Sequence, residues 1–264
     1  MDSLAQSKDD KMLLAQLADR VRQCSDAYMI TNSSFLDLRQ RSVAEGMLRY
    51  QGSLHYEFYG GYEDADRTVA VFLPEYIDGS AEEYFAKNPE DNPLTVLRAT
   101  LSKGSPHLTH RDYLGSMLGL GIKREVTGDI LVREDGADIV VLKDIACYIM
   151  TNMEKAGRAR LRLTEVSISE LIRPESTVKE IVKSVSQTRL DSVVAAIYGL
   201  SRGKAMEAVT SGIVYVNDVE AGKPERHVDA GDKIVLRGRG KAVIKSTDGR
   251  SAKGKTVIVA DRYV

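Results

Sequence analysis

The spacing of hydrophobic residues changes along the chain, and it first predicts a helical region. Residues 11–26 repeat apolar side chains every three or four positions, which is the period of one helix face. The members of that face are Leu13, Leu14, Leu17, Ala18 and Val21. A second helical stretch near residues 36–48 follows a turn-forming run of Thr, Asn and Ser. We therefore expect a mainly helical N-terminal part over residues 1–65.

The next hundred residues alternate strand and helix patterns. Strands are predicted at 54–59, 68–73, 94–101, 129–132, 138–142 and 160–167, and helices after 80, at 109–120 and at 143–155. Ser80 and Glu83 have the spacing of a capping box, and Asp135-Gly136 is a strong hairpin signal. The order β-α-β-α-β-β-α-β, with the strand at 68–73 counted in the sheet, predicts an α+β domain over 66–170. It is close to a ferredoxin-like or RRM-like arrangement with helices on one face, although the aromatic RNP1 signature is missing.

A boundary is predicted at residues 171–177, where Pro174 interrupts the pattern and a capping box at 177–180 starts a new unit. Beyond it, Thr188 is placed to cap a helix that Gly199 ends. Ser201 caps a second helix over 202–211. Alternating arms around Asn217 and a later apolar run predict a small sheet beneath the two helices. We expect this C-terminal domain to span residues 181–264.

Composition narrows the classes of protein. The chain has 264 residues, 43% of them hydrophobic and 28% charged, which predicts a folded protein of about two domains. No apolar run reaches the length of roughly 18 residues that a membrane span needs, and the first ten residues do not resemble a secretory signal. Cys24 and Cys147 are isolated, which excludes a disulfide framework and favours the cytoplasm. The spacing of His107 and His110 predicts no metal site.

Charge is unevenly distributed. Residues 181–264 contain 15 Lys and Arg against 9 Asp and Glu, a net charge of +6, whereas residues 1–180 carry a net charge of −7. This asymmetry indicates a basic C-terminal module that meets a polyanion.

Four short segments of the C-terminal part resemble the S4 RNA-binding domain, in order and in spacing. They are Arg-Leu-Asp at 189–191, Ser-Arg-Gly-Lys-Ala at 201–205, Gly-Ile-Val-Tyr-Val-Asn at 212–217 and Gly-Asp-Lys-Ile at 231–234. Segments 60–63, 110–124 and 128–132 resemble the YlmH family of bacterial S4 proteins. The resemblance implies a central RNA-binding-like domain, a C-terminal S4 domain and association with tRNA and the large ribosomal subunit. It also implies a role in ribosome-associated quality control and a link to cell division.

The candidate RNA-binding residues are mostly cations of the C-terminal part: Arg189, Ser201, Arg202, Lys204, Asn217, Arg237, Arg239 and Lys241. Arg202 and Lys204 follow the Ser201 cap, where cations oppose the helix dipole, so a bound anion would explain them. The cations at 237–241 alternate with glycines and suggest a flexible basic edge. Asn217 fits a hairpin turn better than an RNA contact.

Two other functions remain open. Residues 189–191 also resemble the catalytic stretch of pseudouridine synthases, but we expect Asp191 to cap a helix, and too little chain follows it for a synthase domain. No dinucleotide-binding loop, P-loop or GxSxG motif is present. We expect a non-enzymatic, cofactor-free, monomeric protein of the bacterial cytoplasm that binds rRNA and tRNA, without membrane attachment. The alternatives are an RNA-modifying enzyme and a cell-division scaffold.

Overall fold

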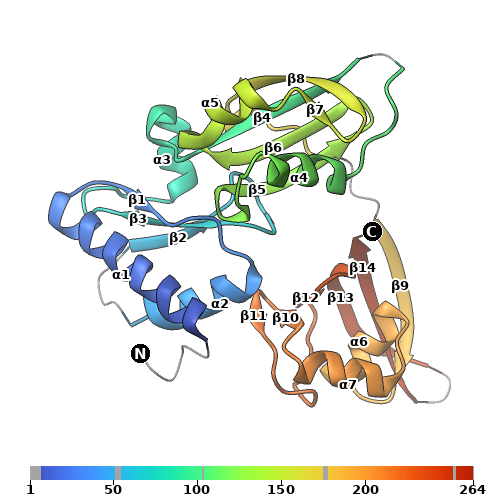
Figure 1. The fold of residues 1–264 in the computed structure, drawn as a ribbon. Coiled ribbons are helices and arrows are strands. Elements are labelled where there is room, and N and C mark those ends of the chain that lie inside the picture. Colours follow the sequence, from blue (N-terminus) through green and yellow to red (C-terminus); the bar gives the residue numbers. More distant parts are fainter. Residues whose placement is uncertain (1–6, 51–54, 103, 175–177, 252–253, 264) are drawn as a thin grey trace. The chain divides into compact units, whose positions relative to one another are not determined.

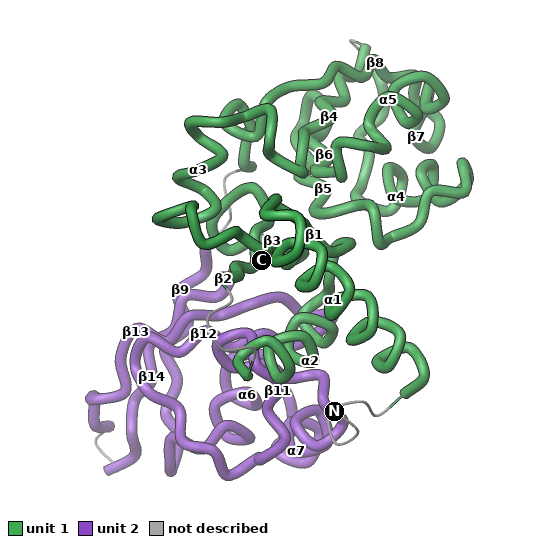
Figure 2. The backbone as a smooth tube through the Cα atoms, turned by 90° about the vertical axis from the view of Figure 1, so that its left-hand side faces the viewer, with its two compact units in different colours: residues 1–174 green, residues 175–264 purple. Residues whose placement is uncertain are grey.

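In the computed structural model, the chain forms two compact units, residues 1–174 and residues 175–264 (Figure 2). The structure describes residues 7–50, 55–102, 104–174, 178–251 and 254–263. None of the helices in these ranges combines the length and the apolar character needed to cross a membrane. The finer division into residues 1–65, 66–170 and 181–264 stays a prediction.

The N-terminal unit begins with a three-stranded antiparallel sheet and two helices beside it (Figure 1). The elements are α1 (Lys8–Ala27), β1 (Thr31–Asn32), α2 (Leu38–Leu48), β2 (His55–Tyr59) and β3 (Val69–Leu73). Ser7 caps α1 and Asp37 caps α2, each through a capping box. Both helices pack their apolar faces in one cluster with Ala70 and Phe72 of β3. The predicted helical N-terminus is confirmed.

The strand predicted at 68–73 exists, but its predicted place in the central sheet is wrong. β3 lies between β1 and β2 in the first sheet. All five residues of β3 are buried, so its sequence carries no alternation that would distinguish one sheet from the other. Because β2 and β3 lie on either side of residue 65, the boundary predicted there falls inside one sheet.

The second sheet of the N-terminal unit has the ferredoxin-like arrangement. Its elements are β4 (Leu94–Leu101), α4 (His110–Gly119), β5 (Thr127–Arg133), β6 (Gly136–Leu142), α5 (Lys143–Asn152), β7 (Lys155–Ala156) and β8 (Ala159–Val166). The strand order is β5-β6-β4-β8-β7, and every pair is antiparallel. With the short β7 set aside, the connectivity is βαββαβ. Tyr113 and Met117 of α4 and Ile149 of α5 share one core with this sheet, which confirms the predicted α+β class.

Short helices complete this unit: α3 (Ala81–Lys87) and the 3₁₀ turns η1 (Pro89–Asp91), η2 (Arg124–Val126) and η3 (Ile168–Glu170). The predicted capping box of Ser80 and Glu83 starts α3. The hairpin turn between β5 and β6 lies one residue earlier than predicted, at Glu134 and Asp135, because Gly136 already pairs with Arg133. Gly136 has a positive φ of 155°, and a Cβ there would collide with the carbonyl oxygen of Ala99. Glycine is therefore needed for close pairing with β4.

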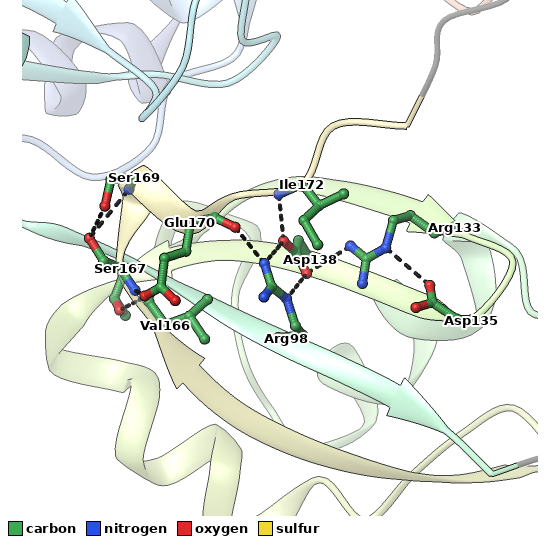
Figure 3. A network of polar contacts seen from close by, with 10 residues as sticks. Arg98, Arg133, Asp135, Asp138, Val166, Ser167, Ser169, Glu170 and Ile172 are labelled. Atoms are coloured by element: carbon green, nitrogen blue, oxygen red, sulfur yellow. Dashed lines mark hydrogen bonds and ion pairs between the residues drawn. The ribbon is translucent and has the colours of Figure 1, made fainter.

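A buried carboxylate on the sheet face opposite α4 and α5 joins the end of this unit to its sheet. Asp138 lies between the guanidinium groups of Arg98 and Arg133 (Figure 3). Arg98 donates from Nε at 3.0 Å and from Nη2 at 2.8 Å, and the Nη1 of Arg133 lies 2.8 Å from the carboxylate. The backbone N–H of Ile172 donates to the same carboxylate at 2.8 Å. Asp138 thus fixes the segment that follows β8 to the middle of the sheet.

The C-terminal unit packs two helices on a six-stranded antiparallel sheet. Its elements are β9 (Val178–Val185), α6 (Leu190–Tyr198), α7 (Arg202–Thr210), β10 (Val214–Val216), β11 (Val219–Glu220), β12 (Lys233–Leu236), β13 (Gly240–Arg250) and β14 (Thr256–Tyr263). The strand order is β11-β10-β12-β13-β14-β9. One core cluster joins both helices to the sheet through residues such as Leu190, Val194, Val209 and Ile234.

Two predicted helix starts in this part are wrong. Thr177 lies outside the described residues, and Val178 begins strand β9 instead of a helix, because its pairing with β14 outweighs the local capping signal. The N-cap of α6 is Arg189 rather than Thr188. The hydroxyl of Thr188 is instead within 2.9 Å of Nδ1 of His227.

Candidate nucleic-acid interface

The start of α7 is the centre of the candidate interface. The predicted cap is present, because Ser201 Oγ accepts the backbone N–H of Lys204 at 3.3 Å. The first turn of α7 contains no acidic residue, and the side chains of Arg202 and Lys204 are exposed. At Gly203 the space where a Cβ would stand is open. The first N–H groups of a helix have no intrahelical partner, so this turn presents both donors and positive charge to an anion.

Asp191 provides a negative charge beside this turn, where the sequence predicts that a bound anion offsets the charges of Arg202 and Lys204. Its carboxylate is buried and accepts two hydrogen bonds from Arg189, from Nε at 3.2 Å and from Nη2 at 3.1 Å. It also accepts a hydrogen bond from the backbone N–H of Ser192 at 2.8 Å. Nε of Arg202 lies 3.5 Å from it. Burial acts to raise the pKa of Asp191, but the hydrogen bonds from Arg189 and Ser192 outweigh it, and the pKa lies below its ordinary value. A carboxylate held in this way orients two arginines and is poorly placed to act as a nucleophile.

The start of α6, in contrast, is closed. The N–H groups of Leu190 and Asp191 donate to the carbonyl oxygens of Arg226 and Pro224, at 2.8 and 3.0 Å. These bonds occupy the donors that an anion would otherwise use. Of the two helix starts in this unit, α7 is therefore the one that is open to a ligand.

Three of the predicted cations come together beside α7. Lys204, Arg237 and Arg239 border a shallow hollow of about 290 Å³, and Glu207 is its acidic neighbour. Arg237 and Arg239 belong to the turn between β12 and β13. That turn is tied down by backbone hydrogen bonds from Arg237 to Ile213 and from Arg239 to Leu236. Residues 237–239 thus form a hydrogen-bonded hairpin turn, and the flexibility predicted for residues 237–241 stays a prediction.

The remaining two predicted residues have structural partners. Asn217 is in the left-handed region with φ of 53°, where it turns the chain from β10 to β11. Its side-chain amide donates to Asp232 at 2.7 Å, and its carbonyl oxygen accepts the N–H of Lys233 at 2.9 Å. Lys241 Nζ lies 5.2 Å from the centre of the Tyr263 ring. The hairpin interpretation of Asn217 agrees with this geometry.

Sequence reasoning missed a supporting residue of this interface, Arg262. Its guanidinium stacks over Tyr198 at 5.1 Å and donates to the carbonyl oxygen of Arg239 at 3.5 Å. The hydroxyl of Tyr198 donates toward the carbonyl oxygens of Ile234 and Gly240. No local motif marks Arg262, because its two partners, Tyr198 and Arg239, come from distant segments of the chain. In the described residues, no three His, Cys, Asp or Glu side chains are grouped so as to hold a metal ion.

Comparisons with known proteins agree with this architecture. Residues 188–234 match the S4 domain, and residues 88–170 match the family described as "Putative RNA-binding domain in YlmH". A relative from Bacillus subtilis (strain 168), "Ribosome-associated protein quality control protein P2", is 29% identical over 255 residues, which are 97% of this chain and 96% of the relative. Both matched families are RNA-binding domains.

The fold is also shared with a solved structure, "Cell division protein ylmH from Streptococcus pneumoniae". It superposes with a TM-score of 0.51 at 20% identity, over 64% of this chain and 97% of that chain. An S4 domain and the YlmH RNA-binding domain occur here in one chain, and the Bacillus relative aligns with nearly its whole length. In this combination of domains the chain is similar to the YlmH-type S4 proteins.

Proposed function

We propose that this protein is a non-enzymatic RNA-binding protein that holds structured rRNA or tRNA on the large ribosomal subunit. The observation that carries the proposal is the open first turn of α7 with its exposed Arg202 and Lys204, together with the hollow that Lys204 borders with Arg237 and Arg239. Guanidinium and ammonium groups beside free helix N–H donors match the phosphate groups of RNA. Arg189 lies beside Arg202, because both side chains form an ion pair with Asp191.

The cellular setting is inferred from the Bacillus relative, whose name refers to ribosome-associated quality control. Its alignment with 97% of this chain supports the same process for this protein. We propose that it acts there as a cytoplasmic monomer, which the ribosome holds through RNA. Asn217 contributes to this surface by shaping the turn between β10 and β11, and Lys241 contributes a positive charge that lies over the Tyr263 ring.

Salt dependence of binding tests the proposal. The full chain is titrated with a fluorescein-labelled RNA stem-loop at several salt concentrations. Four to six phosphate contacts predict that log K falls linearly with log salt, with a slope of roughly −3 to −5. The same chain is then sedimented with purified large or small ribosomal subunits, and we expect it to pellet with the large ones.

The matched variants are Arg202→Ala/Lys204→Ala and the control Lys179→Ala/Lys183→Ala. Each pair removes two exposed positive charges from the C-terminal unit, but the control pair lies on β9. We expect only the first pair to lose RNA affinity and sedimentation with large subunits. A slope near zero, or an equal loss in the control, would contradict the proposed interface.

A further inference from the structure

The β7–β8 hairpin of the N-terminal unit contains an uninterrupted group of cations. Residues 155–162 include Lys155, Arg158, Arg160 and Arg162 and no Asp or Glu, although residues 1–180 have a net charge of −7. All four side chains are exposed. None of them forms a hydrogen bond or an ion pair with any residue that the structure describes. We call these four residues the basic hairpin.

The hairpin is held firmly against the rest of its unit. Ala156 and Ala159 pair across it and are buried in the core beneath α4 and α5. At its tip, the N–H of Gly157 donates to Ser116 Oγ of α4 at 3.3 Å. Lys155 and Arg160 are directly opposed. Opposed residues of an antiparallel pair lie on the same face, so these two cations share the side away from the buried alanines.

The arginines of β8 are regularly spaced along a free edge. Leu161 and Leu163 pack on the core, so Arg160 and Arg162 lie on the other side of the strand. Alternate residues of a strand are roughly 6.6 Å apart, which is close to the spacing of successive phosphates in a nucleic-acid strand. β7 pairs with Ala159 and Arg160, and the N–H of Leu161 donates to the carbonyl oxygen of Glu154 at 3.0 Å. In the described part of the chain, the outer edge of β8 has no strand partner from Arg162 onward.

A hollow continues the basic surface toward α4. Lys155 and Arg160 border about 520 Å³ of space together with Ser116, Gly119 and Glu154. At Gly119, which is exposed, nothing lies within 4 Å of the position of a Cβ. A glycine near the end of an exposed helix allows a ligand backbone to approach closely. The hollow and the arginine row thus form one continuous, mainly cationic surface.

We propose that the basic hairpin is a second RNA-binding site, which takes the phosphodiester backbone of a strand along β8. It extends the proposed function to the N-terminal unit and needs no contribution from α7. The arginine spacing and the lack of acidic residues in 155–162 favour a phosphate ligand, since guanidinium groups bind phosphate oxygens in a bidentate manner. Arg98 and Arg133 are excluded from this site, because Asp138 already binds both.

The test compares three variants of the full chain with a fluorescein-labelled RNA stem-loop that has a single-stranded tail. Arg160→Ala/Arg162→Ala should weaken binding about 10-fold and make the log–log salt slope shallower by about 1.4, which is the loss of two contacts on a single strand. The control Arg20→Ala/Arg22→Ala removes two exposed arginines with the same spacing from α1, and its affinity should change less than about 2-fold. Arg160→Lys/Arg162→Lys keeps the charge, so the salt slope should be unchanged while affinity falls about 3-fold.

Equal affinity of the Arg160→Ala/Arg162→Ala variant and its control would overturn the second site. If the Arg202→Ala/Lys204→Ala pair still loses affinity in that case, the proposed function stands and only this inference fails. If wild-type binding does not depend on salt, the proposed function fails first. Poly-glutamate serves as the acidic-protein probe. If it binds the wild type as tightly as RNA does and loses the same factor in the variant, the hairpin is a site for acidic protein and the RNA assignment is wrong.

Discussion

Each unit contains a buried aspartate that two arginines hold, and the two clusters differ in how far their arginines are exposed to solvent. In the N-terminal unit, Asp138 is 0% exposed, and the side chains of Arg98 and Arg133 are only 22% and 12% exposed. Burial acts to raise the pKa of Asp138, but hydrogen bonds from Arg98, Ile172 and Arg133 keep it below its ordinary value. All the charged groups of this network are largely removed from water, so its role is to hold the sheet and the following segment together.

In the C-terminal unit the same chemistry is left open on one side. Asp191 is 2% exposed, but the side chains of Arg189 and Arg202 are 34% and 68% exposed. Here the buried carboxylate holds one side of each guanidinium group, while the other N–H donors of Arg189 and Arg202 remain in water. A carboxylate beneath exposed arginines restricts their side-chain conformations in advance, so less conformational entropy is lost when they bind an anion. We therefore expect these two similar ion-pair clusters to differ in function, because their arginines differ in exposure.

The largest expected effect follows from breaking the closed cluster. Asp138→Ala removes the buried counter-ion of two poorly hydrated guanidinium groups and leaves Arg133 only the exposed Asp135, so the free energy of unfolding should fall by about 3–5 kcal/mol. Urea denaturation followed by far-ultraviolet circular dichroism measures it. The control is Asp135→Ala, whose exposed ion pair with Arg133 should contribute about 0.5 kcal/mol. Similar losses in both variants would show that burial of the pair is irrelevant.

A smaller loss is expected for the open cluster. Asp191→Ala should lower the free energy of unfolding by about 2 kcal/mol, because Arg202 can rehydrate while the hydrogen bonds to Ser192 and Arg189 are lost. The same urea titration measures it. A loss as large as that of Asp138→Ala would show that the exposure of the arginine partners does not decide the energy of such a cluster.

Arg202→Ala should show the reverse pattern from Asp191→Ala. It should weaken RNA binding by about 1–2 kcal/mol through the loss of a charge-assisted contact, while stability changes by less than about 0.5 kcal/mol. Removing a cation from the first turn of α7 also removes an unfavourable electrostatic interaction with the helix dipole. RNA titration and urea denaturation are made on the same preparation. If Arg202→Ala unfolds the protein and leaves RNA affinity unchanged, the open cluster is structural, like the closed one.

Acid should remove the contribution of either aspartate. The folded pKa of Asp138 is depressed, so its stabilisation is present above the unfolded pKa of about 3.9 and is lost as pH falls through the folded value. The gap in unfolding free energy between the wild type and Asp138→Asn should therefore stay constant from pH 7 to pH 5 and narrow below about pH 4. Urea titrations at each pH give this gap. A gap that widens in acid would show that the folded pKa is raised.

The sequence alone determined the features that depend on near neighbours in the chain. Ser80 and Ser201 cap helices as predicted, since a capping bond joins residues only three apart. Gly199 ends α6 in the left-handed conformation that its position required. The S4 segments and the alternation of strands and helices also predicted the α+β class, because both patterns are local.

Tertiary structure decided what depends on partners far along the chain. The sequence of β3 is uniformly apolar, so only pairing with β1 and β2 assigned it to the first sheet. Thr188 has the right chemistry for a cap, but Arg189 takes that place once the 224–226 carbonyls bind the start of α6. The grouping of Lys204 with Arg237 and Arg239 likewise arises from folding, since Lys204 is more than thirty positions away from both arginines in the sequence. Spacing along the chain encodes caps and turns, whereas hydrogen bonds between distant strands and the burial of charge decide which cations lie together and face solvent.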